Sequence, residues 1–323
     1  MPLKKEQLLD AYSRMKTIRE FEERIHIENT TGDIPGFVHL YAGQEAIATG
    51  VCIHLQDTDY IGSTHRGHGH SIAKGCDVHR MMAEIFGKQN GLCGGKGGSM
   101  HIADLGQGML GANAIVGGNA PLAVGAALTA KVQGTNGVAV SFSGDGASNQ
   151  GTTFESMNMA VVLQLPVIFV FENNGYGEAT GCNYAVGGSS IAERAAGFGL
   201  PATTVDGTDF FSMESAAFEA IGRARAGQGP SVIEAVAMRF YGHFEGDPQV
   251  YRSREELSRV REQGDCLKKF REVVLCQGLI SVDELDKIDT QVMHLIDDAV
   301  EKARSADFPG LDKLLADVYV SYE

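Results

Sequence analysis

Hydrophobic residues near the start of the chain recur at spacings of three and four, the period of a helix with one buried face. The recurring positions are Leu8, Leu9, Tyr12, Met15, Ile18, Phe21 and Ile25. A stretch with two glycines and a proline, at 32–36, then breaks the pattern. We therefore predict a helix over about 5–29 and a second helix over about 42–55.

The centre of the chain alternates between strand and helix patterns. Residues 138–142 favour a strand, 153–163 favour a helix, and 167–171 are five consecutive apolar residues. Such an apolar run is typical of a strand buried on both faces. Two strands joined by a helix should be parallel, with a right-handed crossover. The pattern predicts two further strands with a helix between them, at 203–205, 231–238 and 213–226.

The fold class that follows is α/β, a doubly wound parallel sheet with flanking helices. Two glycine-rich segments, 61–75 and 87–111, are predicted as loops, with a helix over 78–86 between them. After about residue 251 the chain turns to charged helices, and Ser281 begins a capping box. The chain contains no internal repeat or linker. We expect one domain over all 323 residues, with a helical C-terminal region over about 253–323.

Composition narrows the functional class. The chain has 27 basic and 41 acidic side chains, a net charge of −14, which argues against nucleic acid and anionic membranes as partners. No apolar run is long enough to span a membrane, and the N-terminus lacks the apolar core of a secretion signal. The six cysteines contain no C-x-x-C pair. We expect free thiols and a cytoplasmic location.

Two short polar motifs follow the two central strands. Gly144-Asp145-Gly146 comes after the first and Asn173-Asn174 after the second. Ligands of parallel α/β sheets bind at the carboxyl ends of the strands, so these motifs should meet there. Carboxylate and amide oxygens suit Mg²⁺, which is usually completed by phosphate oxygens and water. Backbone N–H groups at the two glycines can approach a diphosphate closely.

These motifs resemble the thiamine diphosphate signature. Further segments in the same order resemble the alpha subunit of the thiamine diphosphate-dependent first component of 2-oxo acid dehydrogenase complexes. They are Gly43-Gln44-Glu45-Ala46, Gly94-Gly95-Lys96-Gly97-Gly98-Ser99-Met100-His101, Ile115-Val116-Gly117 and Asn149-Gln150-Gly151. Together the segments cover roughly residues 10–300. Two others, Glu172 to Thr180 and Arg239 to Asp247, are most similar to those of family members that act on acetoin.

The resemblance implies cofactor roles for specific residues. Asp145, Asn174 and the backbone oxygen of Tyr176 match the family's magnesium ligands. The backbone N–H groups of Gly146 and Ala147 would contact the diphosphate.

The same comparison extends to two other segments. Val116, beside Ala114, matches the apolar residue that supports the bent cofactor. In the loop that begins at His65, Arg66 matches the arginine that holds the diphosphate, although a tyrosine is common in pyruvate enzymes at position 65.

His39 and His243 match the family's active-site histidines, and they would transfer protons. The loop around His243 departs from the pyruvate enzymes. Phe244 stands where animal pyruvate enzymes carry a phosphorylated serine, and Tyr241 replaces a histidine. Glu245 near the site would repel a carboxylate, which favours a neutral substrate.

The resemblance therefore implies an acetoin dehydrogenase activity. Acetoin would be cleaved to acetaldehyde and a hydroxyethyl unit held on the cofactor, and the acetyl group would pass to the lipoyl group of a partner acyltransferase. A pyruvate or branched-chain 2-oxo acid dehydrogenase is the alternative. The glutamate that activates the cofactor belongs to a second domain in this family. We therefore expect a beta subunit in an α₂β₂ heterotetramer.

Other readings are weaker. His65, His68 and His70 could suggest zinc, but they lack cysteine partners and the H-E-x-x-H spacing. Residues 106–111 match a nicotinamide fingerprint without its flanking strand, helix and acidic residue, and 91–99 lack the hydroxyl residue of a phosphate loop. A subunit without catalytic function is disfavoured by the presence of the full set of expected site residues.

Overall fold

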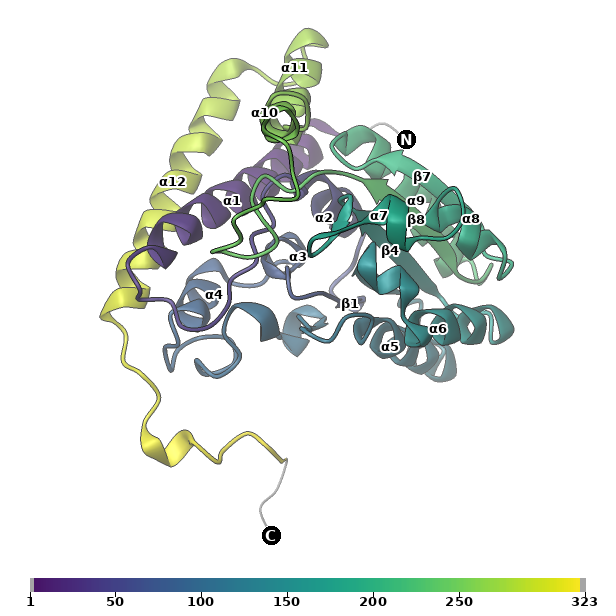
Figure 1. The fold of residues 1–323 in the computed structure, drawn as a ribbon, viewed down its shortest axis with the longest axis horizontal. Helices are drawn as coiled ribbons and strands as arrows, with labels where there is room; N and C mark the ends of the chain where they lie inside the picture. Colours follow the sequence, from purple (N-terminus) through teal and green to yellow (C-terminus); the bar gives the residue numbers. More distant parts are fainter. Residues whose placement is uncertain (1–2, 320–323) are drawn as a thin grey trace.

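The computed structural model describes residues 3–319, and its centre is a six-stranded sheet in the order β2-β1-β3-β4-β8-β7 (Figure 1). All neighbouring strands are parallel, as predicted. The strands are β1 Tyr60–Gly62, β2 Met109–Gly111, β3 Ala139–Gly144, β4 Val167–Asn173, β7 Ala202–Asp206 and β8 Ser231–Val236. A separate two-stranded hairpin, β5 Tyr176–Gly177 with β6 Thr180–Gly181, follows β4. The predicted fold class is therefore confirmed.

Helices cover both faces of the sheet, as Figure 1 shows. They are α1 Lys5–Asn29, α2 Glu45–Cys52, α3 His68–Lys74, α4 Val78–Ile85, α5 Asn119–Gln133, α6 Gly151–Val162, α7 Cys182–Ala185, α8 Ile191–Ala196, α9 Phe210–Arg225, α10 Arg254–Gln263, α11 Cys266–Cys276 and α12 Val282–Ser305. The capping box predicted at Ser281 is present at the start of α12. No helix among residues 3–319 is long and apolar enough to cross a membrane.

The central strand β4 explains why the core has two sides. Ile168 and Val170 pack with residues of α1, α2, α9 and α12 on one face. Val167, Phe169 and Phe171 pack with α5, α6 and α8 on the other. Because successive strand side chains point to opposite faces, a run of five apolar residues fills both cores.

Several elements were not predicted. Strands β1 and β2 and helix α3 lie in segments expected to be loops, and α5 and α8 were missed. Each of the two strands has only three residues and gains its strand geometry from pairing with a distant segment. In α5 the apolar residues are mostly alanine, and Pro121 and Gly125 obscure the helical pattern.

The glycine-rich segment after α4 wraps around a buried carboxylate. Glu84 is fully buried and accepts backbone hydrogen bonds from Cys93, Gly95, Gly97 and Gly98. A side chain at Gly95 would meet the backbone of Gly87 at 2.6 Å. The N–H groups of this loop are therefore used inside the protein, which agrees with the rejection of a phosphate loop.

Residues 106–111, the other glycine pattern, contain strand β2 itself. The strand comes at the end of the pattern and no helix opens there, so the nicotinamide fingerprint stays rejected. The six cysteines are unpaired.

Candidate active site

A cavity of about 380 Å³ opens at the carboxyl ends of the central strands. All eleven residues predicted for the site lie in its wall. They are His39, His65, Arg66, Ala114, Val116, Asp145, Gly146, Ala147, Asn174, Tyr176 and His243. This volume is within the usual range for small-molecule sites. The sequence motifs therefore converge on one place, although they come from segments as distant as residues 39 and 243.

Asp145 and Asn174 supply side-chain oxygens in the wall of the cavity. Asp145 follows the last residue of β3, and Asn174 follows the last residue of β4, its parallel neighbour. Burial raises the pKa of Asp145, although the positive charges of Arg239 and Arg66 act in the opposite direction. The Nδ2 atom of Asn174 donates to Oε1 of Gln44 at 3.1 Å, and its Oδ1 atom is buried without a partner. Among the described residues, neither side-chain oxygen forms an ion pair or a hydrogen bond with another side chain.

The backbone beside these oxygens is packed very closely. A side chain at Gly177 would meet the Cα atom of Gly146 at 3.3 Å, so the β5–β6 hairpin lies directly against the turn after β3. Ala147 is buried in that turn. The phenol of Tyr176 donates to Glu256 of α10 at 3.1 Å, which fixes the hairpin from outside the cavity. The close approach brings backbone polar groups to the cavity wall.

Three histidines form a cluster on another wall. The ring centroid of His39 lies 4.7 Å from that of His65 and 5.0 Å from that of His243, and the centroids of His65 and His243 are 5.2 Å apart. Burial, with Arg66 nearby, lowers the pKa of His39 to about 3 and that of His243 to about 4. The pKa of His65 is lowered for the same reasons. The three imidazoles are therefore neutral at pH 7.

Arg66 connects the segments that carry two of these histidines. Its guanidinium donates to the backbone oxygen of Leu40 at 2.6 Å and to that of His243 at 2.9 Å. Burial and the neighbouring Arg239 lower the pKa of Arg66 to about 9. Two of the five N–H donors of the Arg66 guanidinium are therefore used on backbone oxygens.

The loop around His243 is held by contacts that sequence reasoning did not foresee. Asp247 accepts from the His243 backbone N–H at 2.6 Å. Glu245 does not line the cavity, because its carboxylate pairs with His26 of α1 at 2.9 Å. Glu245 is therefore not in the wall that a substrate would touch, and its repulsion of a substrate carboxylate stays a prediction.

A second group of histidines has a structural role. His68 contacts Glu22 at 3.0 Å and Ser99 at 2.9 Å, and His70 contacts Ser63 at 2.7 Å and Glu172 at 3.0 Å. Both are fully buried. The two rings use their nitrogens inside the core, so the rejection of a zinc site made by His65, His68 and His70 agrees with the structure.

Sequence reasoning missed some residues of the cavity wall, among them Thr64, Met100, Asn113, Glu172 and Glu178. Glu172 could have been predicted from the sequence, because a carboxylate directly after an apolar strand and before an asparagine pair signals a buried acid. It holds His70 and the hydroxyl of Tyr41. The other four carry no local signal.

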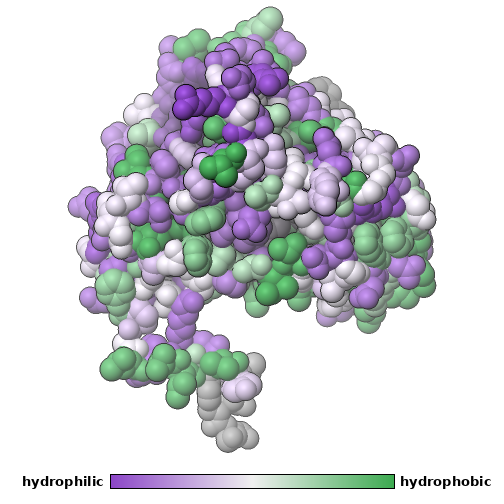
Figure 2. All heavy atoms as spheres, viewed as in Figure 1, coloured by the Kyte–Doolittle hydropathy of each residue, from purple (hydrophilic) through white to green (hydrophobic). Residues whose placement is uncertain are grey.

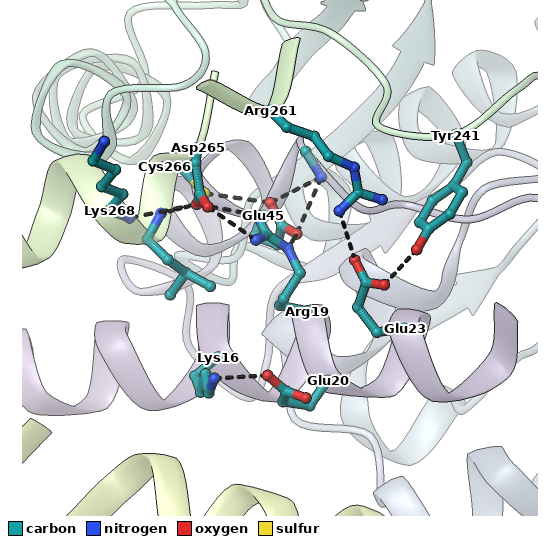
Figure 3. Close-up of polar contacts among 12 residues, drawn as sticks. Lys16, Arg19, Glu20, Glu23, Glu45, Tyr241, Arg261, Asp265, Cys266 and Lys268 are labelled. Carbon is teal, nitrogen blue, oxygen red and sulfur yellow. Dashed lines mark hydrogen bonds and ion pairs between the residues drawn. The ribbon is translucent and has the colours of Figure 1, made fainter. Parts of the chain in front are cut away.

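An ion-pair network behind the cavity fixes the helix that carries Gln44. Glu45 is fully buried and binds Arg19 of α1 at 2.5 Å, and Arg19 reaches Asp265 before α11 (Figure 3). The same carboxylate accepts from the Gly43 backbone at 3.1 Å. Gln44 lies between Gly43 and Glu45 in the chain, and its side chain accepts a hydrogen bond from Asn174. The ion-pair network therefore supports the oxygens of Asp145 and Asn174 from a distance.

The wall combines two kinds of chemistry. The oxygens of Asp145 and Asn174 suit a hard dication that also binds phosphate. The neutral imidazoles can each donate one hydrogen bond and accept another. Among the described residues of the wall Arg66 is the one cation, and the same wall contains three carboxylates, Asp145, Glu172 and Glu178.

Comparison with known proteins adds independent information. A family model described as the dehydrogenase E1 component matches residues 13–312. The chain is 58% identical over 322 residues to the alpha subunit of an acetoin:2,6-dichlorophenolindophenol oxidoreductase of Cupriavidus necator, covering 100% of this chain and 97% of that protein. Its counterpart in Bacillus subtilis is 54% identical over 323 residues, covering 100% and 96%. A pyruvate dehydrogenase E1 component alpha subunit of Zymomonas mobilis is 40% identical over 317 residues, covering 98% and 89%.

Proposed function

Because the chain belongs to the dehydrogenase E1 component family, we propose that it is the alpha subunit of a thiamine diphosphate-dependent acetoin dehydrogenase. Full-length identity of 58% and 54% to two acetoin oxidoreductase alpha subunits carries the substrate assignment. A pyruvate dehydrogenase alpha subunit is the second candidate, on 40% identity over nearly the whole chain.

The cofactor is supported by the donor set of the cavity. Asp145 and Asn174 would hold Mg²⁺ through side-chain oxygens, together with the backbone oxygen of Tyr176. The partnerless Oδ1 of Asn174 and the burial that raises the pKa of Asp145 fit such an ion, since a bound dication would satisfy both oxygens. Gly146 and Ala147 would offer backbone N–H groups to the diphosphate, and Arg66 would offer its remaining donors.

Thiamine diphosphate, when bound, supplies a carbanion that can add to a carbonyl group. The residues of this chain would orient the reactants and move protons. Ala114 and Val116 would support the cofactor's shape from the apolar side of the cavity. His39 and His243 are neutral at pH 7, because burial lowers their pKa, so each can hydrogen-bond to the hydroxyl group of the substrate. The negative charge of a bound diphosphate would raise these pKa values, and in the loaded complex the two histidines would then transfer the hydroxyl proton.

A neutral substrate agrees with the charges of the wall. A 2-oxo acid carries a carboxylate that needs a cation or several free donors. Arg66 is the one cation of the described wall, and part of its guanidinium is used by the Leu40 and His243 backbones. The three neutral imidazoles can donate hydrogen bonds to a hydroxyl or a carbonyl oxygen without adding charge.

A beta subunit would complete the site, in an α₂β₂ heterotetramer that works with a lipoyl-bearing acyltransferase. Exposed apolar side chains in the cavity wall support a partner there, since Ile115 is 71% exposed and Val116 45%. The segment after α12 extends from the body and carries further hydrophobic side chains, visible in Figure 2. Leu311 on this segment is 92% exposed.

The unpaired cysteines support a cytoplasmic location.

The test uses the chain co-expressed with its beta partner. Thiamine diphosphate and Mg²⁺ are added, and reduction of dichlorophenolindophenol is followed with acetoin or with pyruvate. We expect acetoin to be preferred. Preference for pyruvate would favour the second candidate, and activity with neither would contradict both.

The matched variant Asp145→Asn keeps the shape of the side chain but removes its charge. Mg²⁺-dependent cofactor binding should weaken more than about 100-fold, since loss of a ligand's supporting partner alone costs roughly 10–100-fold. Unchanged binding would exclude Asp145 as a ligand.

A further inference from the structure

The cluster of His39, His65 and His243 has unused coordination capacity. Each ring offers a nitrogen, and these nitrogens all lie within 4.8 Å of one another. The Nδ1 atom of His39 is buried with no hydrogen-bond partner, and His39 itself is only 8% exposed. Elsewhere in the core, by contrast, His68 and His70 each use both ring nitrogens.

We propose that these three imidazoles bind a borderline transition-metal dication, with Zn²⁺ as the representative, whenever the cavity holds no cofactor. Three protein nitrogens with an open fourth position form a common zinc coordination set. The ion would be distinct from Mg²⁺ in place and in chemistry, because it binds nitrogen and Mg²⁺ prefers the oxygens of Asp145 and Asn174.

The geometry requires only side-chain movement. Zinc–nitrogen bonds of 2.0–2.1 Å put tetrahedral ligand nitrogens about 3.3 Å apart, so the nitrogens, which lie within 4.8 Å of one another, must approach by at most about 1.5 Å. The three residues lie on separate segments, before α2, after β1 and after β8, and no ring nitrogen of the cluster is hydrogen-bonded to another described residue. Rotation of the rings therefore breaks no hydrogen bond between described residues, although it changes the ring contacts within the cluster and with Phe244.

The charge state of the cluster also fits. Histidine binds a metal through its neutral form, which predominates near pH 7. Arg66 and Arg239, whose positive charges act on all three rings, oppose a cation here. Asp145, Glu172 and Glu178 in the same wall offset that charge.

The site should exchange its metal readily. Metal-bound histidines usually donate their second nitrogen to a carboxylate or a carbonyl, which raises affinity roughly 10–100-fold. None of the three rings has such a partner. We therefore infer a reversible, inhibitory site and not a structural one. This consequence rests on the proposed function, because the ion and thiamine diphosphate would compete for one cavity.

Zinc binding is measured on the full chain after removal of metals and cofactor. Zn²⁺ is titrated against a chromophoric chelator in excess Mg²⁺, which occupies the oxygen set. His65→Gln should weaken zinc binding more than about 100-fold, since a ligand is lost. His294→Gln is the matched control, because it removes an exposed histidine of α12. Equal affinities of the two variants would overturn the proposal.

A second measurement needs no variant. X-ray absorption of the zinc-loaded wild-type chain should show imidazole nitrogen ligands, and Co²⁺ should give the visible bands of a tetrahedral site. A zinc ion surrounded by oxygen alone would overturn the proposal even if the variants did not fold.

Competition separates this inference from the proposed function. Thiamine diphosphate with Mg²⁺ should raise the apparent zinc dissociation constant at least tenfold in the complex with the beta subunit. Simultaneous binding of both would overturn the competition. If the zinc-free complex fails to bind thiamine diphosphate, the proposed function fails, and the zinc measurement on the histidine cluster still stands.

Discussion

The buried ion pair between Arg19 and Glu45 allows a quantitative test of how the helices support the site. The Glu45 carboxylate is fully buried and accepts from Arg19 Nε at 2.5 Å, from the Gly43 backbone at 3.1 Å and from the thiol of Cys266 at 3.3 Å. Glu45→Gln keeps the size of the side chain and removes its charge. Arg19 then stays buried without its main counter-charge.

The expected cost follows from the partners that remain. Removing one member of a buried ion pair costs about 3–5 kcal/mol. Arg19 keeps a contact to Asp265 at 3.3 Å, and the side chain of Asp265 is 27% exposed, so we expect the lower end, about 3 kcal/mol. The free energy of unfolding is measured by urea denaturation at pH 7, followed by circular dichroism.

Glu20→Gln is the control, because it makes the same change in α1. Glu20 pairs with Lys16 one turn away, and both side chains are about one-fifth exposed. Such a pair contributes about 0.3–0.5 kcal/mol. If Glu45→Gln costs no more than Glu20→Gln, the buried pair does not hold α1 and α2 together. The Mg²⁺ concentration for half-maximal cofactor binding should also rise in Glu45→Gln alone, since Gln44 positions Asn174.

Three further predictions concern other parts of the molecule. Glu84→Gln should lower the free energy of unfolding by about 3 kcal/mol and expose the backbone amides of residues 93–98 to hydrogen exchange, because four backbone donors lose a charged acceptor. Unchanged hydrogen exchange would contradict this prediction. The pKa of His39 is about 3 when folded and about 6.5 when unfolded, so the unfolded chain binds an extra proton at pH 5. Unfolding of the cofactor-free protein should therefore become easier by about 2 kcal/mol from pH 7 to 5, and His39→Gln should lack this portion; an equal pH dependence in both proteins would refute it. Ser281→Ala should lower the melting temperature through a loss of about 1 kcal/mol at the α12 cap, which differential scanning calorimetry would detect, and an unchanged transition would show the cap to be irrelevant.

The order of the main elements was predictable because their signals are local. The apolar run of β4 has to be buried on both faces, and the 3.6-residue period of α1 has to place one face in the core. The placement of Asp145 and Asn174 followed from the same rule, since parallel strands that lie next to each other end at one edge.

Strands β1 and β2 were not predictable in this way. Each has three residues, and each becomes a strand because a partner far along the chain offers hydrogen bonds. In β1, for example, Ile61 lies opposite Met109 of β2 and opposite Val140 of β3. The role of Glu84 was hidden for a similar reason. A glutamate in an amphipathic helix normally faces water, and here the glycine loop that follows encloses it.

The sequence by itself determined the fold class, the strand ends that carry the oxygen ligands and the family resemblance, because each depends on short patterns or on neighbouring strands. Only the tertiary structure decided that Glu245 turns toward His26, that Gln44 holds Asn174, and that three histidines from distant segments meet as neutral rings. The physical reason is that burial and charge interaction depend on distances between residues, and those distances are set only when the separate segments pack against one another.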